Sequence, residues 1–383
     1  MKITCNRDQL LTAFQTAATV AAARTSKPIL QNVKMEAMDG KVSLTATDLE
    51  VGIRVELPDQ DVEVPGSALL SVAQFGPILR ESSDQQLRIE SDGQGLRIRG
   101  DRSRFKLPSQ NPAEFPDFPE PKDANYYTVP GRLLRELIRR TLFATDTDSS
   151  RYALGGVLLE FGDDKITAVG TDGRRLAKME GPLGKTGYPS VGESMTIVPA
   201  RSMQLIERAI HDLDQEVQLL SHGNEFVVRH GGSTIVTRLV EGRFPRWRDV
   251  LPKRSDSFAI ELTVGPLLSA VRQAAIVTSN DSRGIDLAFG NGQLVILGTT
   301  AEVGESRVEM PIAYEGPEVV LCLDHRYLTD FLRVLDSEKS FTVHLVDGDS
   351  AALCETDDGY AYVVMPLARD RAVRGAATAE AAH

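Results

Sequence analysis

The chain is short of cysteine and has no long run of apolar residues. Its 383 residues include three cysteines, Cys5, Cys322 and Cys354, which stand too far apart for a disulfide framework or a Cys-x-x-Cys metal site. We expect them to be reduced residues of the core or of strands. No apolar stretch approaches the roughly 18 residues of a membrane span, and the start of the chain lacks a signal-peptide core. These absences predict a cytoplasmic protein that binds no membrane.

Sequence patterns of catalytic sites are also missing. The six histidines show no H-E-x-x-H spacing, and there is no Gly-x-Ser-x-Gly nucleophile motif. Gly184-Lys185-Thr186 is similar to the end of a phosphate-binding P-loop, but Met179 stands where the first glycine belongs, so we expect this segment to be a loop. The sequence therefore predicts no catalytic residue, no metal, no cofactor and no enzyme activity.

One pattern, however, occurs three times along the chain. Each third begins with an amphipathic segment opened by a leucine pair, at Leu10-Leu11, Leu133-Leu134 and Leu267-Leu268. Alternating strand segments follow and end near Thr47-Asp48, Thr171-Asp172 and Thr299-Thr300. Each third closes on an apolar residue and a proline, at Phe115-Pro116, Phe244-Pro245 and Met365-Pro366. So long a period indicates whole domains, not a solenoid; we place them at 1–124, 125–253 and 254–369, before a flexible tail at 370–383.

Each domain is expected to combine two helices with antiparallel sheets, an α+β fold. In the middle third, residues 131–142 and 200–211 have the apolar periodicity of helices, and segments such as 156–161 and 165–170 are typical of strands around a glycine turn. Asp48 and Asp172 fall at equivalent turns. An aspartate there normally caps local backbone groups, and a catalytic role is the alternative.

Positive charge is concentrated on the predicted helices. The segments 7–20, 67–80, 131–142, 200–211, 265–276 and 325–335 together carry +7 in a chain of net charge −11, so the remainder carries −18. On the segment 131–142, Arg132, Arg135 and Arg139 fall opposite the apolar side. One such helix is typical of an ordinary solvated surface. Six helices with none net negative favour a basic surface that binds phosphate backbones without reading bases.

Three motifs occur together in an order and spacing that are specific to one known family. They are Thr171-Asp172-Gly173-Arg174-Arg175-Leu176, Glu241-Gly242-Arg243-Phe244-Pro245 leading to Val250-Leu251-Pro252, and Tyr362-Val363-Val364-Met365-Pro366. The chain closely resembles the bacterial sliding clamps, the β subunits of DNA polymerase III, from residue 1 to about 368. The resemblance implies three tandem domains of the DNA-clamp fold, forming half of a six-domain ring. It further implies a processivity factor that encircles duplex DNA; a DNA-binding scaffold that forms no ring is the alternative.

The resemblance also implies roles for single residues. Arg24, Tyr152 and Arg201 would contact DNA, and the charge pattern adds Arg132, Arg135 and Arg139. A head-to-tail homodimer would join the first domain of one copy to the third domain of the other through Phe105, Ile276 and Val277. The alternative for each of these residues is a place on an ordinary surface or in the core.

A pocket for short apolar peptides of the replicative polymerase, the clamp loader and repair proteins is implied as well. Its walls would be Leu154, Thr171, Gly173, Arg174, Arg175, Leu176, Pro245, Val250, Val363, Val364, Met365 and Pro366. An apolar cleft with a few polar groups suits such peptides. Arg174 stands where histidine is common in the family, Asp249 where a basic residue is common and Asp349 where an apolar one is common. We expect partner preference to depend on these departures.

Overall fold

The structure falls into two compact units. The computed structural model describes residues 1–22, 25–92, 95–119, 125–146, 152–187, 195–254, 257–279 and 282–367. One unit comprises Met1–Arg135 and Pro182–Val240, and the other comprises Glu136–Gly181 and Glu241–His383. Each unit therefore combines one end of the chain with half of the middle third. Arg24 and the tail predicted from residue 370 lie outside the described residues.

The first unit is built on two antiparallel sheets. One has the order β5 (Asp61–Val64), β1 (Lys2–Asn6), β7 (Gln86–Ser91), β8 (Leu96–Arg99) and β9 (Arg104–Leu107). The other has the order β14 (Gly184–Thr186), β10 (Tyr126–Pro130), β16 (Glu216–His222), β17 (Glu225–His230), β18 (Ser233–Arg238), β4 (Val51–Leu57), β3 (Lys41–Thr47), β2 (Asn32–Met38) and β6 (Gly66–Ser71). The pairing of β18 with β4, for example Val236 opposite Gly52, joins strands of the first and middle thirds in one sheet.

The second unit repeats this plan. Its longer sheet contains the order β11 (Gly156–Phe161), β12 (Lys165–Thr171), β13 (Arg175–Pro182), β26 (Tyr360–Val364), β25 (Ala352–Glu355), β24 (Ser340–Leu345) and β19 (Phe258–Thr263). The other sheet has the order β22 (Gly304–Pro311), β21 (Gln293–Thr300), β20 (Gly284–Gly290) and β23 (Val319–Asp324). Here β13 pairs with β26, with Leu176 opposite Val363, so the middle and last thirds also share a sheet.

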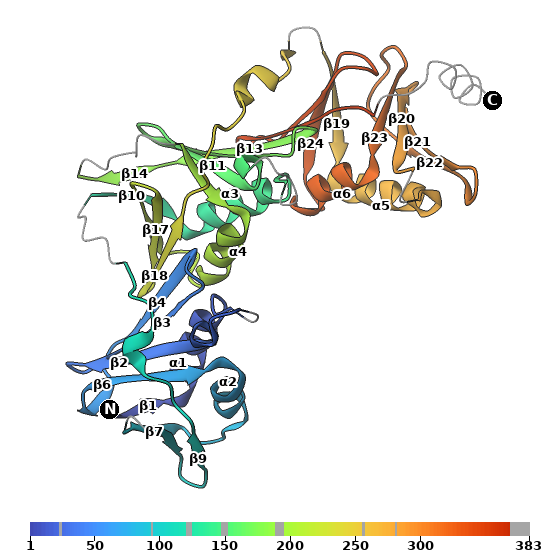
Figure 1. Ribbon diagram of the computed structural model, residues 1–383. Helices are drawn as coiled ribbons and strands as arrows, with labels where there is room; N and C mark the ends of the chain where they lie inside the picture. Colours follow the sequence, from blue (N-terminus) through green and yellow to red (C-terminus); the bar gives the residue numbers. More distant parts are fainter. Residues whose placement is uncertain are drawn as a thin grey trace. The chain divides into compact units, whose positions relative to one another are not determined.

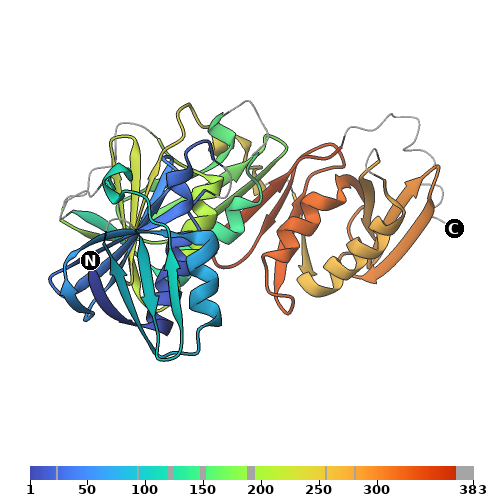
Figure 2. The same cartoon turned by 60° about the horizontal axis from the view of Figure 1, so that its bottom comes forward.

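The α helices of the described residues are α1 (Arg7–Ala18), α2 (Val72–Glu81), α3 (Gly131–Leu142), α4 (Ala200–Ala209), α5 (Val264–Ala274) and α6 (His325–Arg333). In the first unit, α1 packs on α2 through an edge-to-face contact of Phe14 and Phe75, whose ring centroids lie 5.1 Å apart. In the second unit, α5 lies beside α6 against one side of the strands (Figures 1 and 2).

The helix predicted over residues 131–142 is confirmed as α3. It spans the predicted residues, and Leu134, Leu137 and Ile138 are buried while Arg132, Arg135 and Arg139 are exposed. The arginines therefore lie on the outer side of a core-packed helix.

Two predictions of local structure are wrong. The helix expected over 67–80 begins only at Val72, because the apolar run Ala68-Leu69-Leu70 pairs with β2 as a fully buried strand. Gly184-Lys185-Thr186 is not a loop but the edge strand β14, paired with β10. In both cases, pairing with a distant strand decides the local structure.

The internal repeat is visible where strands pass under helix ends. A Cβ added to Gly170 would lie 2.2 Å from the Thr141 carbonyl oxygen, and one added to Gly298 would lie 2.5 Å from that of Ala274. Thr141 belongs to α3, and Ala274 ends α5. Glycine at these two equivalent places therefore lets a strand approach a helix end more closely than any side chain allows.

The cysteines are buried and unbridged, on β1, β23 and β25, as predicted. Burial raises the pKa of Cys5 and of Cys354 to about 12, so neither forms a thiolate near neutral pH. Within the described residues, no helix is both long enough and apolar enough to cross a membrane.

Candidate docking surface and DNA-facing residues

The turn that links β12 to β13 is held by its own side chains. Asp172 Oδ1 accepts hydrogen bonds from the backbone N–H groups of Arg174 (2.9 Å) and Arg175 (3.0 Å). The Thr171 hydroxyl donates to the Arg175 carbonyl oxygen (2.6 Å) and accepts from the Gly173 N–H (3.1 Å). Gly173 has a φ of +86°, which favours glycine. The predicted role of Asp172 as a turn cap is confirmed, and the turn is rigid without outside partners.

Arg175 connects this turn to the rest of the second unit. Its Nε donates to Asp172 (3.0 Å), one terminal nitrogen donates to Asp330 on α6 (2.8 Å), and the other donates to the Phe143 carbonyl oxygen (2.8 Å). The guanidinium carbon also lies 4.5 Å from the centre of the Tyr327 ring. Burial would lower the pKa of Arg175, but the bond to Asp330 and nearby negative charge raise it above its ordinary value. Arg175, whose side chain is 10% exposed, is therefore a cross-link rather than a free cation.

The last strand supplies the opposite wall of this region. On β26, Val363 and Val364 are buried and pair with β13 in the same sheet. Just after this strand, the Met365 N–H donates to the Arg174 carbonyl oxygen (2.9 Å). The Met365 side chain is 44% exposed, and Pro366 is partly buried. Because Gly173 has nothing within 4 Å of an added Cβ, open space and an exposed thioether lie next to each other at the end of the sheet.

Pro245 and Val250 lie on a segment that is tied to β11. Both are exposed, Val250 by 45%. Between them Trp247 is buried and donates from its indole N–H to Glu160 on β11 (3.3 Å). Leu154, in the short helix η3 (Tyr152–Leu154) before β11, is buried. The predicted wall residues thus divide between buried members, which position the surface, and exposed members, which a ligand can touch.

The arginines predicted to contact DNA are exposed, and each lies near a carboxylate. The pairs are Arg132 with Asp214 (3.1 Å), Arg135 with Glu207 (4.0 Å), Arg139 with Glu136 (2.9 Å) and Arg201 with Asp48 (2.8 Å). Exposed pairs are weak, so a phosphate can replace the carboxylate at little cost. The pair of Arg201 differs from the others, because the Asp48 side chain is only 7% exposed. Tyr152 is the first residue of η3, and Arg24 lies outside the described residues.

The residues predicted for the dimer contact lie at or near the outer strands of two sheets. Phe105 is on β9, the last strand of its sheet, and is 38% exposed. Ile276, in the short helix η6 (Ala275–Val277) after α5, is 75% exposed, and Val277 beside it is partly buried. Exposed Val303 precedes β22, the outer strand of the other sheet. Large apolar side chains at unpaired strand edges are typical of protein contacts.

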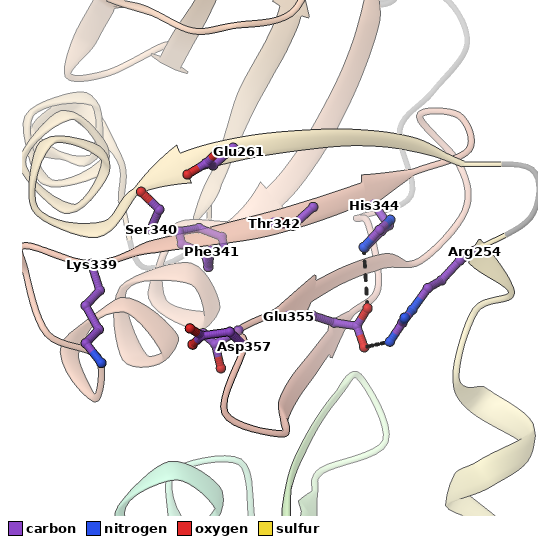
Figure 3. A pocket seen from close by; sticks show the side chains of 10 residues that line it. Arg254, Glu261, Lys339, Ser340, Phe341, Thr342, His344, Glu355 and Asp357 are labelled. Atoms are coloured by element: carbon purple, nitrogen blue, oxygen red, sulfur yellow. Dashed lines mark hydrogen bonds and ion pairs between the residues drawn. The ribbon is translucent and has the colours of Figure 1, made fainter.

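A separate pocket in the second unit, of about 670 Å³, lies on the outer side of β19, β24 and β25 (Figure 3). Its central carboxylate, Glu355, pairs with Arg254 (2.6 Å) and lies 3.4 Å from the ring nitrogen of His344. The side chains of Lys339 and Asp357 lie on the other side of Glu355 from Arg254. The lining carries charges of both signs, so the pocket presents no clear preference for a charged ligand.

Comparison with known proteins covers the whole length of the fold. Models for the N-terminal, central and C-terminal domains of the DNA polymerase III beta subunit match residues 1–119, 128–246 and 248–368. The beta sliding clamp of Pseudomonas putida is 32% identical over 380 residues, with 96% of this chain and 100% of that protein covered.

The chain belongs to the DNA polymerase III beta-subunit family, the sliding clamps. The crystal structure of the Pseudomonas aeruginosa subunit matches with a TM-score of 0.89 and 32% identity, over 96% of this chain and 100% of that one. A second P. aeruginosa structure, bound to griselimycin, has a TM-score of 0.89 and 31% identity over the same shares. The predicted fold of three tandem clamp domains is confirmed.

Sequence reasoning missed the residues that hold the candidate docking surface together. Asp330, Tyr327 and Phe143 all contact Arg175, yet they come from distant parts of the chain and belong to none of the three motifs. Apolar periodicity places Phe143 and Tyr327 near helices but says nothing of a shared cation. The pairing of β13 with β26 is what brings them together.

Proposed function

We propose that two copies of this chain close head to tail into a ring around duplex DNA. The ring acts as a processivity factor: it slides on DNA without reading sequence and tethers the replicative polymerase, the clamp loader and repair proteins through short peptides. The domains are 1–124, 125–253 and 254–369. The protein catalyses no reaction of its own, needs no cofactor or metal, and works in the cytoplasm.

Two exposed strand edges of opposite charge carry the proposal of a ring. On β9, Arg104 and Lys106 are exposed on either side of Phe105. On β22, Glu305, Arg307 and Glu309 are exposed, and because Arg307 pairs with Glu309 (2.7 Å), this edge carries a net charge of −1. An outer strand offers unpaired N–H and C=O groups to another strand. Opposite charge on the two edges favours β9 of one copy against β22 of another and disfavours each edge against itself.

The basic helices supply the inner surface of the proposed ring. The observed helices sum to +6, slightly less than predicted, because α2 includes Glu81 and is neutral. A ring must open before it can leave a closed DNA circle, so contacts with phosphate can stay weak and salt-sensitive. Such contacts hold no fixed register on the duplex and therefore allow sliding.

Retention on DNA tests the ring directly. After loading, the protein should stay on circular DNA and be lost quickly once that DNA is cut, because a free end lets a closed ring slide off. The protein is loaded on nicked circular DNA, and gel filtration measures how much of it stays with the DNA before and after cutting by a restriction enzyme. Equal retention on both forms would support the alternative, a scaffold that forms no ring.

Dimer closure has its own test, with a control on the same sheet. Phe105→Asp should produce a monomer in light scattering, since it buries a carboxylate in the proposed contact. Val64→Asp is the matched control, because Val64 is 47% exposed on β5, the opposite edge of that sheet. A dimer that survives Phe105→Asp, or one lost equally in both variants, would contradict the proposed contact.

A further inference from the structure

Arg174 presents a cation at the docking surface on a backbone that cannot move freely. Its N–H donates to Asp172 Oδ1 (2.9 Å), and its carbonyl oxygen accepts from Met365 N–H (2.9 Å). The residue is exposed, between the open space at Gly173 and the exposed Met365 side chain. Its backbone is therefore held by two hydrogen bonds, while the residue itself is exposed to solvent.

The carboxylates nearest to Arg174 are already engaged. Asp172 accepts two backbone N–H groups on one oxygen and the Nε of Arg175 on the other. Asp324 accepts the backbone N–H and the Nε of Arg326 on one oxygen and a terminal nitrogen of Arg326 on the other (2.5 Å). Both aspartates attract the Arg174 guanidinium and help to raise its pKa, but among the described residues neither forms an ion pair with it.

Two neighbouring arginines already form ion pairs. Arg175 pairs with Asp172 and Asp330, and Arg326 pairs with Asp324. Burial lowers the pKa of His325, which leaves that ring uncharged near neutral pH. The hydrogen bond to Tyr327 raises the pKa of Arg174. A neutral phenol forms no ion pair with Arg174, so this guanidinium can bind an anion from outside.

We propose that Arg174 selects docked peptides that carry a carboxylate next to their apolar anchors. The inference rests on the proposed function of this surface in peptide docking, and it adds a chemical preference that the buried walls cannot provide. A carboxylate fits the planar guanidinium and is attracted by its positive charge. An aspartate or glutamate side chain and a peptide's terminal carboxylate share this chemistry.

A peptide series separates these sources. The probes are fluorescent peptides of one length with the same leucine and phenylalanine anchors, amidated at the C-terminus, in which aspartate replaces asparagine at each flanking position in turn. One further peptide has the asparagine sequence and a free C-terminal carboxylate. Fluorescence anisotropy measures the affinity of the full-length chain and of Arg174→Gln, Arg174→Lys and Arg174→Glu for each peptide.

The matched control is Arg254→Gln. Arg254 is also an exposed arginine of the second unit, 68% exposed and paired with Glu355 in the pocket of Figure 3. The Arg254→Gln substitution removes the same charge as Arg174→Gln but at a place outside the docking surface. Thermal melting of every variant checks that the chain remains folded. Arg174→Lys keeps the positive charge but loses the planar guanidinium, so it separates the effect of charge from the effect of shape.

At least one acidic peptide should bind the unaltered chain about three- to tenfold more tightly than its asparagine twin, between the strengths of an exposed ion pair and a charge-assisted hydrogen bond. Arg174→Gln should abolish this gain, Arg174→Glu should reverse it, and Arg254→Gln should leave it unchanged. If acidic and neutral peptides bind equally, or Arg174→Gln keeps the preference, the selectivity inference fails while docking stands. If no peptide binds the unaltered chain, docking itself is overturned, and the inference with it.

Discussion

The turns at Thr47–Val51 and Thr171–Arg175 share one backbone and differ in what they present. In the first, the Thr47 hydroxyl donates to the Val51 carbonyl oxygen (3.0 Å), and Asp48 Oδ1 accepts from the N–H groups of Glu50 (3.0 Å) and Val51 (2.8 Å). The second turn repeats each of these bonds with Thr171 and Asp172. The Thr-Asp pair therefore specifies the turn, not the docking surface.

The differences lie at the third and fourth positions and in the cation that pairs with the aspartate. Leu49, at φ +80° and 40% exposed, and Glu50 occupy the places of Gly173 and Arg174. Asp48 faces Arg201, which is 62% exposed, whereas Asp172 faces Arg175, which is 10% exposed. The second turn differs from the first in two respects that suit docking. Gly173 leaves open space beside the turn, and Arg175 ties the turn to α6.

The largest effect should come from removing the cross-link formed by Arg175. Arg175→Ala leaves Asp172, Asp330 and the Phe143 carbonyl without their partner, which should cost about 3 kcal/mol of unfolding free energy and at least tenfold in peptide affinity. Urea denaturation and anisotropy measure the two quantities. Arg201→Ala is the matched change at the first turn and should cost less, no more than about 1 kcal/mol, because Arg201 is 62% exposed although Asp48 is only 7% exposed. Similar losses in both variants would remove the distinction between the turns.

An exchange at the third position should have a smaller effect, of opposite sign at the two turns. Gly173→Leu places a side chain at a positive φ, costing about 1 kcal/mol, and fills the open space beside Met365, which should weaken peptide binding. Leu49→Gly relieves the same strain and should raise stability by up to about 1 kcal/mol with peptide affinity unchanged. If Leu49→Gly weakens docking as much as Gly173→Leu, the first turn also belongs to the docking surface.

The smallest effect is expected when Arg201, the exposed partner of Asp48, loses its charge but keeps much of its length. Arg201→Gln should shift stability by no more than about 1 kcal/mol, yet lower the slope of log affinity for DNA against log salt by about one. Arg248→Gln is the control, since Arg248 is 65% exposed and paired with Glu160 away from the basic helices. An equal change of slope in both variants would show only a general effect of charge.

The sequence predicts the fold of this protein better than it predicts the contacts of the candidate site. Periodicity located α3 and its buried leucines, because local apolar spacing determines which side of a helix faces the core. It failed at Ala68-Leu69-Leu70, where pairing with β2 outweighs local preference. Motifs pointed to Thr171–Leu176 and Tyr362–Pro366, but the cross-link from Arg175 to Asp330 depends on strands far apart in the chain. No local pattern encodes that contact.

Hydrogen–deuterium exchange, with and without a bound peptide, tests most directly the claim that only the second turn is a docking surface. Amide protection should increase at residues 171–176 and 363–366, and exchange at residues 47–51 should stay the same within error. Equal protection at both turns, or protection at 47–51 alone, would contradict the account.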